Sequence, residues 1–158
     1  MSVYNSETSV EDSINSILNQ TYENFEFLIL DDCSTDKTRE ILNEYKSKDK
    51  RIKIFYNNEN IGLTKSLNKL ISSSNTKLIA RQDGDDISLP NRLKIQLEYL
   101  NKYNLDACTS RAFIKSTKKK VPKFSYLIPD NLVIRYKNPF IHGSLIIKSE
   151  ILSKLGSY

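Results

Sequence analysis

The stretch Phe25-Glu26-Phe27-Leu28-Ile29-Leu30, followed at once by Asp31-Asp32, decides the fold. It is short and mostly apolar, and such a run is typical of a strand buried in a sheet. The stretch Leu78-Ile79-Ala80 shows the same pattern and soon leads into the acidic cluster Asp83-Gly84-Asp85-Asp86. Ligands of open α/β sheets bind beyond the carboxyl ends of the strands, so both acidic groups are expected at one binding edge.

Helical patterns lie between these strand-like segments. Apolar residues recur at helical spacing within residues 10–18, 41–45, 63–71 and 93–100, and residues 52–56 form another strand-like run. Strands that alternate with helices predict an α/β fold, with a mainly parallel sheet and helices on both faces. After residue 106 the pattern loosens, and we expect strands at 107–113 and 145–148 and a short helix at 130–136.

The composition fits one globular domain over residues 1–158. Hydrophobic residues make up 39% of the chain and charged residues 27%, which excludes a disordered chain. No apolar run approaches the roughly 20 residues that span a bilayer. The polar residues after Met1 do not resemble a secretory signal, and Cys33 and Cys108 make no disulfide framework. We therefore expect a cytoplasmic protein.

Positive charge gathers in the last third of the chain. Residues 107–158 have a net charge of +8, whereas residues 1–106 have a net charge of −3. A basic segment of this kind could face anionic lipid, a phosphorylated substrate or nucleic acid, or it could be a solvated surface. The run Lys118-Lys119-Lys120 contains no aromatic residue for base stacking, so nucleic acid is the least favoured partner. We expect a peripheral contact with the inner membrane surface.

The acidic cluster at residues 83–86 is the first candidate site. Neighbouring carboxylates repel one another, and a cation that neutralises them makes such a cluster tolerable. Oxygen ligands suit Mg²⁺ or Mn²⁺, which would also hold the phosphates of a substrate. The alternative is a solvated acidic turn in which Asp86, for example, caps the following helix.

Two further positions are candidates for ligand binding. A carboxylate of Asp31-Asp32 could accept a hydrogen bond from the N3–H of a uracil-like base, and Tyr4 could stack on that base. Alternatively, one aspartate caps a helix and Tyr4 is an ordinary half-buried aromatic. His142, the single histidine, could reach a metal, a diphosphate or an acceptor, or it could be structural.

Motifs spread over essentially the whole chain resemble family 2 glycosyltransferases with the GT-A fold. In chain order they are Val3-Tyr4-Asn5-Ser6-Glu7, Asp31-Asp32-Cys33-Ser34-Thr35-Asp36, Asn60-Ile61-Gly62-Leu63-Thr64-Lys65-Ser66-Leu67-Asn68, Asp83-Gly84-Asp85-Asp86 with Leu89-Pro90-Asn91-Arg92-Leu93, and Asn138-Pro139-Phe140-Ile141-His142-Gly143-Ser144.

The resemblance implies a reaction and a set of site residues. The reaction would be inverting transfer of a sugar from a nucleotide diphosphate donor, most often a UDP-sugar, to a polysaccharide or glycolipid acceptor. A bound Mn²⁺ or Mg²⁺ would act as a Lewis acid on the leaving group. By matching position, Tyr4 and Asp32 would contact the base with Glu7 nearby, and Lys65 would add positive charge near the nucleotide. Asp83 would reach the ribose and the metal, and Asp85 would bind the metal.

The chain departs from the family pattern at two places. The first strand is shorter than usual, and family members continue beyond the segment Leu155-Gly156-Ser157-Tyr158 with an acidic residue that serves as general base. The chain therefore resembles the nucleotide-sugar-binding portion of the family, and no general base is assigned.

Two alternatives to an active transferase stay open. One is a truncated remnant that binds the nucleotide sugar without transferring it. The other is a phosphoacceptor receiver domain, which also gathers aspartates at strand ends. A receiver needs those acids after its first and third strands, whereas here they follow the second and fourth expected strands.

Overall fold

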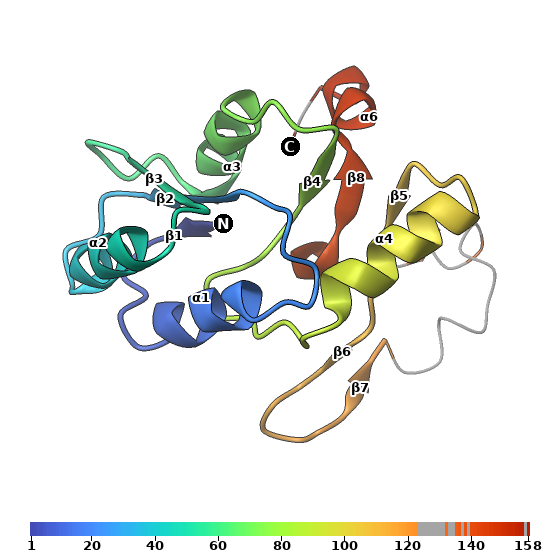
Figure 1. Ribbon diagram of the computed structural model, residues 1–158, viewed down its shortest axis with the longest axis horizontal. Coiled ribbons are helices and arrows are strands. Elements are labelled where there is room, and N and C mark those ends of the chain that lie inside the picture. The colour runs from blue at the N-terminus through green and yellow to red at the C-terminus, as the bar shows by residue number, and fades with distance from the viewer. Residues whose placement is uncertain (123–131, 133–134, 137, 139, 157) are drawn as a thin grey trace.

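Two three-stranded sheets form the centre of the structure (Figure 1). The structure is a computed structural model that describes residues 1–122, 132, 135, 136, 138, 140–156 and 158. The first sheet is parallel, in the order β1-β2-β3. The second is antiparallel, in the order β4-β8-β5, and a hairpin joins β6 to β7. The strands are β1 (Ser2–Val3), β2 (Phe27–Asp31), β3 (Ile52–Tyr56), β4 (Leu78–Ala80), β5 (Ala107–Cys108), β6 (Ala112–Phe113), β7 (Lys120–Val121) and β8 (Ile146–Lys148).

Helices cover both faces of the parallel sheet, as the sequence predicts. Figure 1 shows α3 on one side of this sheet and α1 and α2 on the other. The helical segments are α1 (Val10–Leu18), α2 (Thr38–Lys48), α3 (Leu63–Ser72), α4 (Arg92–Lys102), the 3-10 turn η2 (His142–Ser144) and α6 (Ser149–Lys154).

The core has one part for each sheet. In the first part Val10, Ile14, Ile29 and Leu42 are fully buried, so α1 and α2 are held against β2. The second part joins α4 to β8 through three buried side chains, those of Leu93, Leu100 and Ile146. The two parts fix the parallel and antiparallel sheets in one α/β body.

The structure differs from the expected elements after residue 90. The strand expected over residues 107–113 is divided into β5 and β6, which belong to different sheets. The face of α4 that enters the core carries Gln96, which is buried, whereas Leu97 is partly exposed. Gln96 fits there because its Nε2 donates to the carbonyl of Ser144 at 2.8 Å. The helix expected at 130–136 lies mostly outside the described residues.

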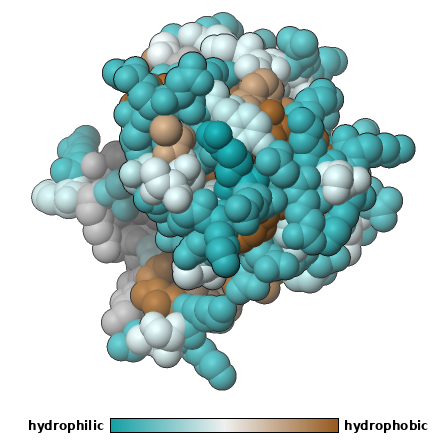
Figure 2. Space-filling view, turned by 90° about the vertical axis from the view of Figure 1, so that its left-hand side faces the viewer, coloured by the Kyte–Doolittle hydropathy of each residue, from teal (hydrophilic) through white to brown (hydrophobic). Residues whose placement is uncertain are grey.

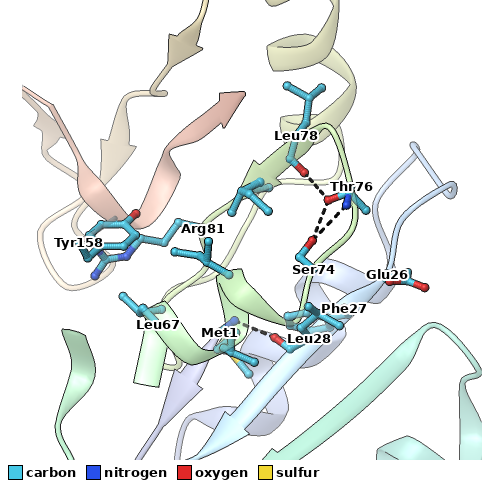
Figure 3. Close-up of a pocket in the computed structure, with 14 residues that line it drawn as sticks. Met1, Glu26, Phe27, Leu28, Leu67, Ser74, Thr76, Leu78, Arg81 and Tyr158 are labelled. Atoms are coloured by element: carbon cyan, nitrogen blue, oxygen red, sulfur yellow. Dashed lines mark hydrogen bonds between the residues drawn. The ribbon is translucent and has the colours of Figure 1, made fainter. Parts of the chain in front are cut away.

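A mainly apolar cavity of about 110 Å³ lies between β2, β4 and α3 (Figure 3). Its walls include Phe27, Leu67 and Ile79. The amino group of Met1 donates to the carbonyl of Leu28 at 2.8 Å beside it. Arg81 also lines this cavity and extends from there to the acidic cluster. None of the described helices is both long and apolar enough to cross a membrane.

Candidate functional site

A cavity of about 430 Å³ lies beyond the carboxyl ends of β1 and β4. It brings together three of the residues predicted from the sequence, Tyr4, Asp83 and Asp85. Gly84 is required where the acidic loop crosses β1, because a Cβ there would lie 2.7 Å from Cγ1 of Val3. The complete lining is Ser2, Val3, Tyr4, Asn5, Ser6, Thr8, Ser9, Leu63, Asp83, Gly84 and Asp85.

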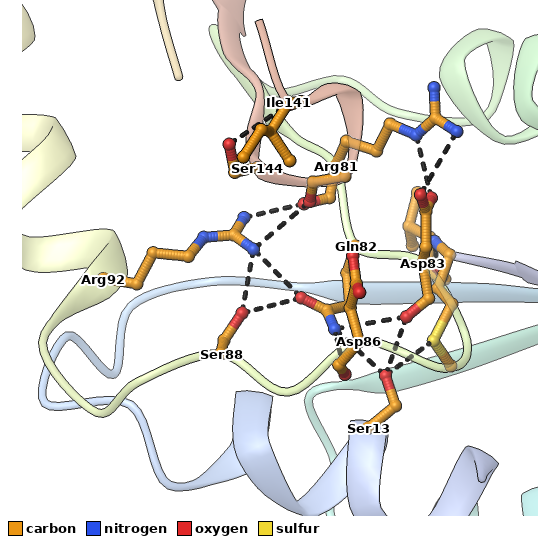
Figure 4. A network of polar contacts seen from close by, with 12 residues as sticks. Ser13, Arg81, Gln82, Asp83, Asp86, Ser88, Arg92, Ile141 and Ser144 are labelled. Carbon is orange, nitrogen blue, oxygen red and sulfur yellow. Dashed lines mark hydrogen bonds and ion pairs between the residues drawn. The ribbon is translucent and has the colours of Figure 1, made fainter. Parts of the chain in front are cut away.

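Hydrogen bonds from α1 and its N-terminal flank hold the acidic loop by its backbone. The hydroxyl of Ser13, which is fully buried, donates to the carbonyl of Asp83 at 3.0 Å, and that of Ser9 donates to the carbonyl of Gly84 at 3.1 Å. Gln82 Nε2 donates to the carbonyl of Asp86 at 2.7 Å (Figure 4). Because the backbone is fixed from behind, the carboxylates of the loop are left to face the cavity and its margin.

Arg92 closes this network on the side of α4 (Figure 4). Its guanidinium donates to Gln82 Oε1 at 2.9 Å, to Ser88 Oγ at 2.8 Å and to the carbonyl of Arg81 at 2.7 Å. Burial lowers the pKa of Arg92 to about 10, so the side chain is still a cation at neutral pH. It supplies a fixed positive charge behind the acidic loop.

A second arginine pairs directly with the cluster. Arg81 Nε lies 2.9 Å from Asp83 Oδ1, and the two side chains are 10% and 30% exposed. The guanidinium of Arg81 also lies over the ring of Tyr158, 5.4 Å from its centroid. Asp83 is thus already neutralised by a cation in this structure, and a metal at this carboxylate would share it with Arg81.

Asp86 approaches Asp83 at the margin of the cavity. An ideal Cβ on Gly143 would lie 2.5 Å from Asp86 Oδ2 and 2.9 Å from Asp83 Oδ2, so both carboxylates pack against the glycine of η2. Desolvation raises the pKa of Asp86, and the negative charges of Asp83 and Asp85 raise it further. The N-cap residue of α4 is Asn91, and the side chain that caps this end is that of Gln20, whose Oε1 accepts a hydrogen bond from the backbone N–H of Leu93 at 3.0 Å, so Asp86 is not the cap of this helix.

The acidic loop offers oxygen atoms of the kind that bind a divalent cation. Within the described part of the chain, no three His, Cys, Asp or Glu side chains are grouped as a complete metal site. Mg²⁺ in phosphate-transfer sites is commonly bound through one or two carboxylates, with phosphates and waters supplying the other oxygens. Asp83 and Asp85 line one cavity and Asp86 adds negative charge beside them, which is the donor set that such an ion needs.

Asp31 at the end of β2 and Asp32 directly after it are engaged in structural contacts. Asp32 is 2% exposed and accepts hydrogen bonds from Asn57 Nδ2 at 2.7 Å, Ile61 N at 3.0 Å and Gly62 N at 2.8 Å. Burial alone would raise the pKa of Asp32, but these hydrogen bonds outweigh it and lower the pKa. Asp31 pairs with Arg39 at 3.0 Å. Asp32 therefore fixes the loop that leads into α3, and it does not line the cavity.

The remaining predicted residues lie around the cavity rather than in its lining. Glu7 Oε2 accepts a hydrogen bond from the backbone N–H of Lys37 at 3.0 Å, at the N-terminus of α2. Lys65 is exposed in the first turn of α3, which begins at the lining residue Leu63. His142 is exposed beside Gly143, and its Nε2 lies 2.6 Å from Asn138 Nδ2.

Sequence reasoning missed the residues that support the acidic loop. Ser13, Gln82 and Gly143 contact partners that are distant in the sequence, so the local pattern does not show what these residues bind. Arg92 stood inside a stretch that resembles the family, but the pattern gave it no function. A polar residue on an otherwise apolar helical face was the available signal for Ser13 between Val10 and Ile14.

The sequence matches the family model described as glycosyl transferase family 2 over residues 1–156. The chain belongs to this family. One relative of this family 2 chain is the O-antigen biosynthesis glycosyltransferase WbnJ of Escherichia coli, 33% identical over 164 residues, with all of this chain and 63% of WbnJ covered. The chain spans a little over half the length of the curated relatives that it matches from end to end.

Solved structures confirm the GT-A fold predicted for this family 2 chain. S. aureus TarS in complex with UDP-GlcNAc superposes with a TM-score of 0.83 at 21% identity, covering 99% of this chain and 46% of TarS. The mannosyltransferase PcManGT from Pyrobaculum calidifontis, in complex with GDP-Man and Mn²⁺, gives 0.79 at 20% identity, with 99% and 45% covered. Family membership also shows that the receiver-domain alternative is wrong.

Proposed function

We propose that this chain is the donor-binding portion of an inverting glycosyltransferase that takes its sugar from a nucleoside diphosphate, with a UDP-sugar as the first candidate. The observation that carries the proposal is the cavity in which Tyr4 meets Asp83 and Asp85 beyond the ends of β1 and β4. The bound UDP-GlcNAc of TarS and the GDP-Man and Mn²⁺ of PcManGT support it, since both proteins share this fold.

Different residues of the cavity lining suit different parts of the donor. Tyr4 is 48% exposed, which leaves a ring face for stacking on the base. Asp83 and Asp85 would hold Mn²⁺ or Mg²⁺, which when bound neutralises the charge that develops on the leaving diphosphate. Lys65 would add positive charge from the start of α3. Arg81 and Arg92 hold the acidic loop and oppose its charge when no metal is bound.

Contact of Asp32 with the base stays a prediction, and it requires a free acceptor position on the Asp32 carboxylate. Both carboxylate oxygens already accept backbone N–H groups, from Ile61 and Gly62. A base could engage Asp32 if it used a remaining lone pair or displaced one of these donors. Glu7 would act beside it by fixing the start of α2, where its carboxylate meets the backbone of Lys37.

We propose a polysaccharide or glycolipid acceptor and work at the inner membrane surface. The role of WbnJ in O-antigen biosynthesis supports an acceptor of this kind. The second candidate function is a module that binds the nucleotide sugar without transferring it. The two candidates differ in the general base, which inverting displacement needs and simple binding does not.

Calorimetric titration tests donor binding directly. UDP, GDP and dTDP are titrated with and without Mn²⁺ into the parent chain and the variant Asp85→Asn, and Asp106→Asn serves as the matched control at an exposed aspartate paired with Lys148. We expect Mn²⁺-dependent binding of UDP that Asp85→Asn weakens by roughly 10-fold or more and Asp106→Asn leaves unchanged. No heat with any nucleotide would overturn the proposal. Acceptor-dependent release of UDP would exclude the binding module.

A further inference from the structure

The hairpin of β6 and β7 projects from the body of the molecule as an exposed unit (Figure 1). Every residue from 113 to 120 is exposed. The backbone of its turn is nevertheless hydrogen-bonded: the N–H of Lys118 donates to the carbonyl of Ile114 at 2.7 Å, and the N–H of Ile114 donates to that of Lys119 at 3.0 Å. The hairpin therefore presents its side chains on a defined backbone.

Its side chains combine apolar and cationic groups. Phe113 is 55% exposed and Ile114 is 44% exposed, although burial of either would be favourable. In Figure 2, at the height where Figure 1 places the hairpin, brown apolar surface adjoins teal hydrophilic side chains. The cations beside the apolar pair are Lys118, Lys119 and Lys120, together with Lys115, whose Nζ lies 3.8 Å from Asp12 Oδ2 of α1. The sequence has no acidic residue between Asp106 and Asp130.

We propose that this hairpin docks on the surface of a bilayer that contains anionic lipids. Phe113 and Ile114 would enter the headgroup region, and the lysines would lie among the lipid phosphates. Lys120 already lies over the ring of Phe113, with its Nζ 5.7 Å from the ring centroid. A cationic and an apolar side chain therefore lie on the same face of the hairpin. An RNA or an acidic peptide would engage the lysines, but neither explains an exposed Phe-Ile pair beside them.

The segment that leads into the hairpin is hydrogen-bonded to η2, which packs against the acidic loop. Ser110, just before β6, donates its N–H to Ser144 Oγ at 2.9 Å, and Ser144 Oγ donates to the carbonyl of Ser110 at 3.1 Å. Ser144 follows Gly143, against which Asp83 and Asp86 pack. Docking of the hairpin would thus hold the candidate site at a fixed distance from the bilayer. The inference rests on the proposed work at the inner membrane surface and names the element that makes the contact, but it requires neither nucleotide nor transfer.

Vesicle co-sedimentation tests the inference. The chain is mixed with vesicles of phosphatidylcholine alone and with vesicles in which phosphatidylglycerol supplies an anionic surface. The first variant, Phe113→Ser with Ile114→Ser, removes the apolar pair. The second, K118Q with K119Q and K120Q, removes three cations. The matched control is K46Q with K50Q and K77Q, at exposed lysines of other elements.

We expect binding to the anionic vesicles and little to phosphatidylcholine alone. Loss of the three hairpin lysines should weaken partitioning roughly 100-fold, since each lysine near an anionic surface contributes about fivefold. Loss of the apolar pair should weaken it roughly 10-fold or more. Thermal melting of each variant checks that it is folded. Equal weakening by the control triple variant would overturn the proposal, as would binding of RNA with the same lysine dependence in place of vesicles. Calorimetry with UDP is unaffected by these outcomes, so the two proposals fail separately.

Discussion

Replacing Gly143 by alanine places one methyl group against two carboxylates of the candidate site. The new Cβ would lie 2.5 Å from Asp86 Oδ2 and 2.9 Å from Asp83 Oδ2. To reach ordinary contact at 3.4 Å, the two oxygens must move by about 0.9 Å and 0.5 Å. Gly143 does not have a left-handed φ, so the backbone itself accepts alanine. The perturbation is therefore confined to the positions of the carboxylates.

The expected effect on stability is small and the effect on binding is large. Overpacking costs about 1–3 kcal/mol, and the lower end applies because the atoms that must move are side-chain ends. About 1 kcal/mol lowers the melting temperature of a chain this size by roughly 2–4 °C. A metal site tolerates displacements of about 0.2 Å, so Mn²⁺-dependent affinity for UDP should fall roughly 10–100-fold.

Calorimetric titration of UDP with Mn²⁺ and thermal melting without metal measure the two effects. Gly84→Ala is the contrasting variant, because its Cβ would meet the core residue Val3 at 2.7 Å and should therefore cost mainly stability. Adding Asp86→Ala to Gly143→Ala should relieve the loss of stability, since the nearest clash is removed. If Gly143→Ala folds normally and binds UDP within twofold of the parent chain, the carboxylates of Asp83 and Asp86 are not part of the donor site.

Three further substitutions test the charges around the site by thermal melting. Asp32→Asn should cost about 1–3 kcal/mol at pH 7, because its NH₂ would face the N–H of Gly62 or another donor. The pKa of Asp32 is lower in the folded than in the unfolded chain, so the stability that this carboxylate contributes is present above the unfolded pKa of about 4 and is lost as pH falls through the folded pKa. A difference in melting temperature between variant and parent that is the same at pH 2 and pH 7 would contradict this. Asp86→Asn should raise the metal-free melting temperature by removing repulsion, and weaken Mn²⁺-dependent UDP binding; a lower melting temperature with full binding would refute both parts. Arg81→Met should cost about 1–3 kcal/mol by leaving Asp83 unpaired, with part of the loss restored by Mn²⁺ but not by K⁺ at the same ionic strength; equal effects of the two cations would exclude a specific site.

The elements that the sequence predicted well are those with a local cause. The strands at 52–56 and 78–80 have the bounds that their apolar runs indicate. The acidic residues could be placed at strand ends because one strand-length apolar run stops directly before Asp31 and another stops shortly before Asp83. The local sequence shows this without knowledge of any contact partner. The meeting of Tyr4 with Asp83 could be predicted for the same reason, since both follow strand ends at one edge of the fold.

The parts that could not be predicted depend on contacts between distant segments. Strand β8 lies between β4 and β5 and runs antiparallel to both, with Ile146 opposite Ala80. Such pairing leaves no trace in the periodicity of either segment. The role of Asp32 could not be predicted for the same reason, since its position in the sequence fits either a base contact or a structural role. Only the folded chain places three donors around its carboxylate, from Asn57, Ile61 and Gly62.

In the acidic loop the backbone provides the rigidity and the aspartate side chains provide the charge. Its backbone carbonyls accept hydrogen bonds from Ser13 and Gln82, which fixes the loop without using a carboxylate. Its negative charge is opposed from behind by Arg92 and at one side by Arg81. Desolvation raises the pKa of Asp86, and the negative charges of Asp83 and Asp85 raise it further in spite of both arginines. A purely structural turn would gain by replacing one of these aspartates with a neutral residue. Charge that is held rigidly and left partly uncompensated beside a cavity is what the binding of a cation requires, because the cation then supplies the missing neutralisation together with the phosphates that it carries.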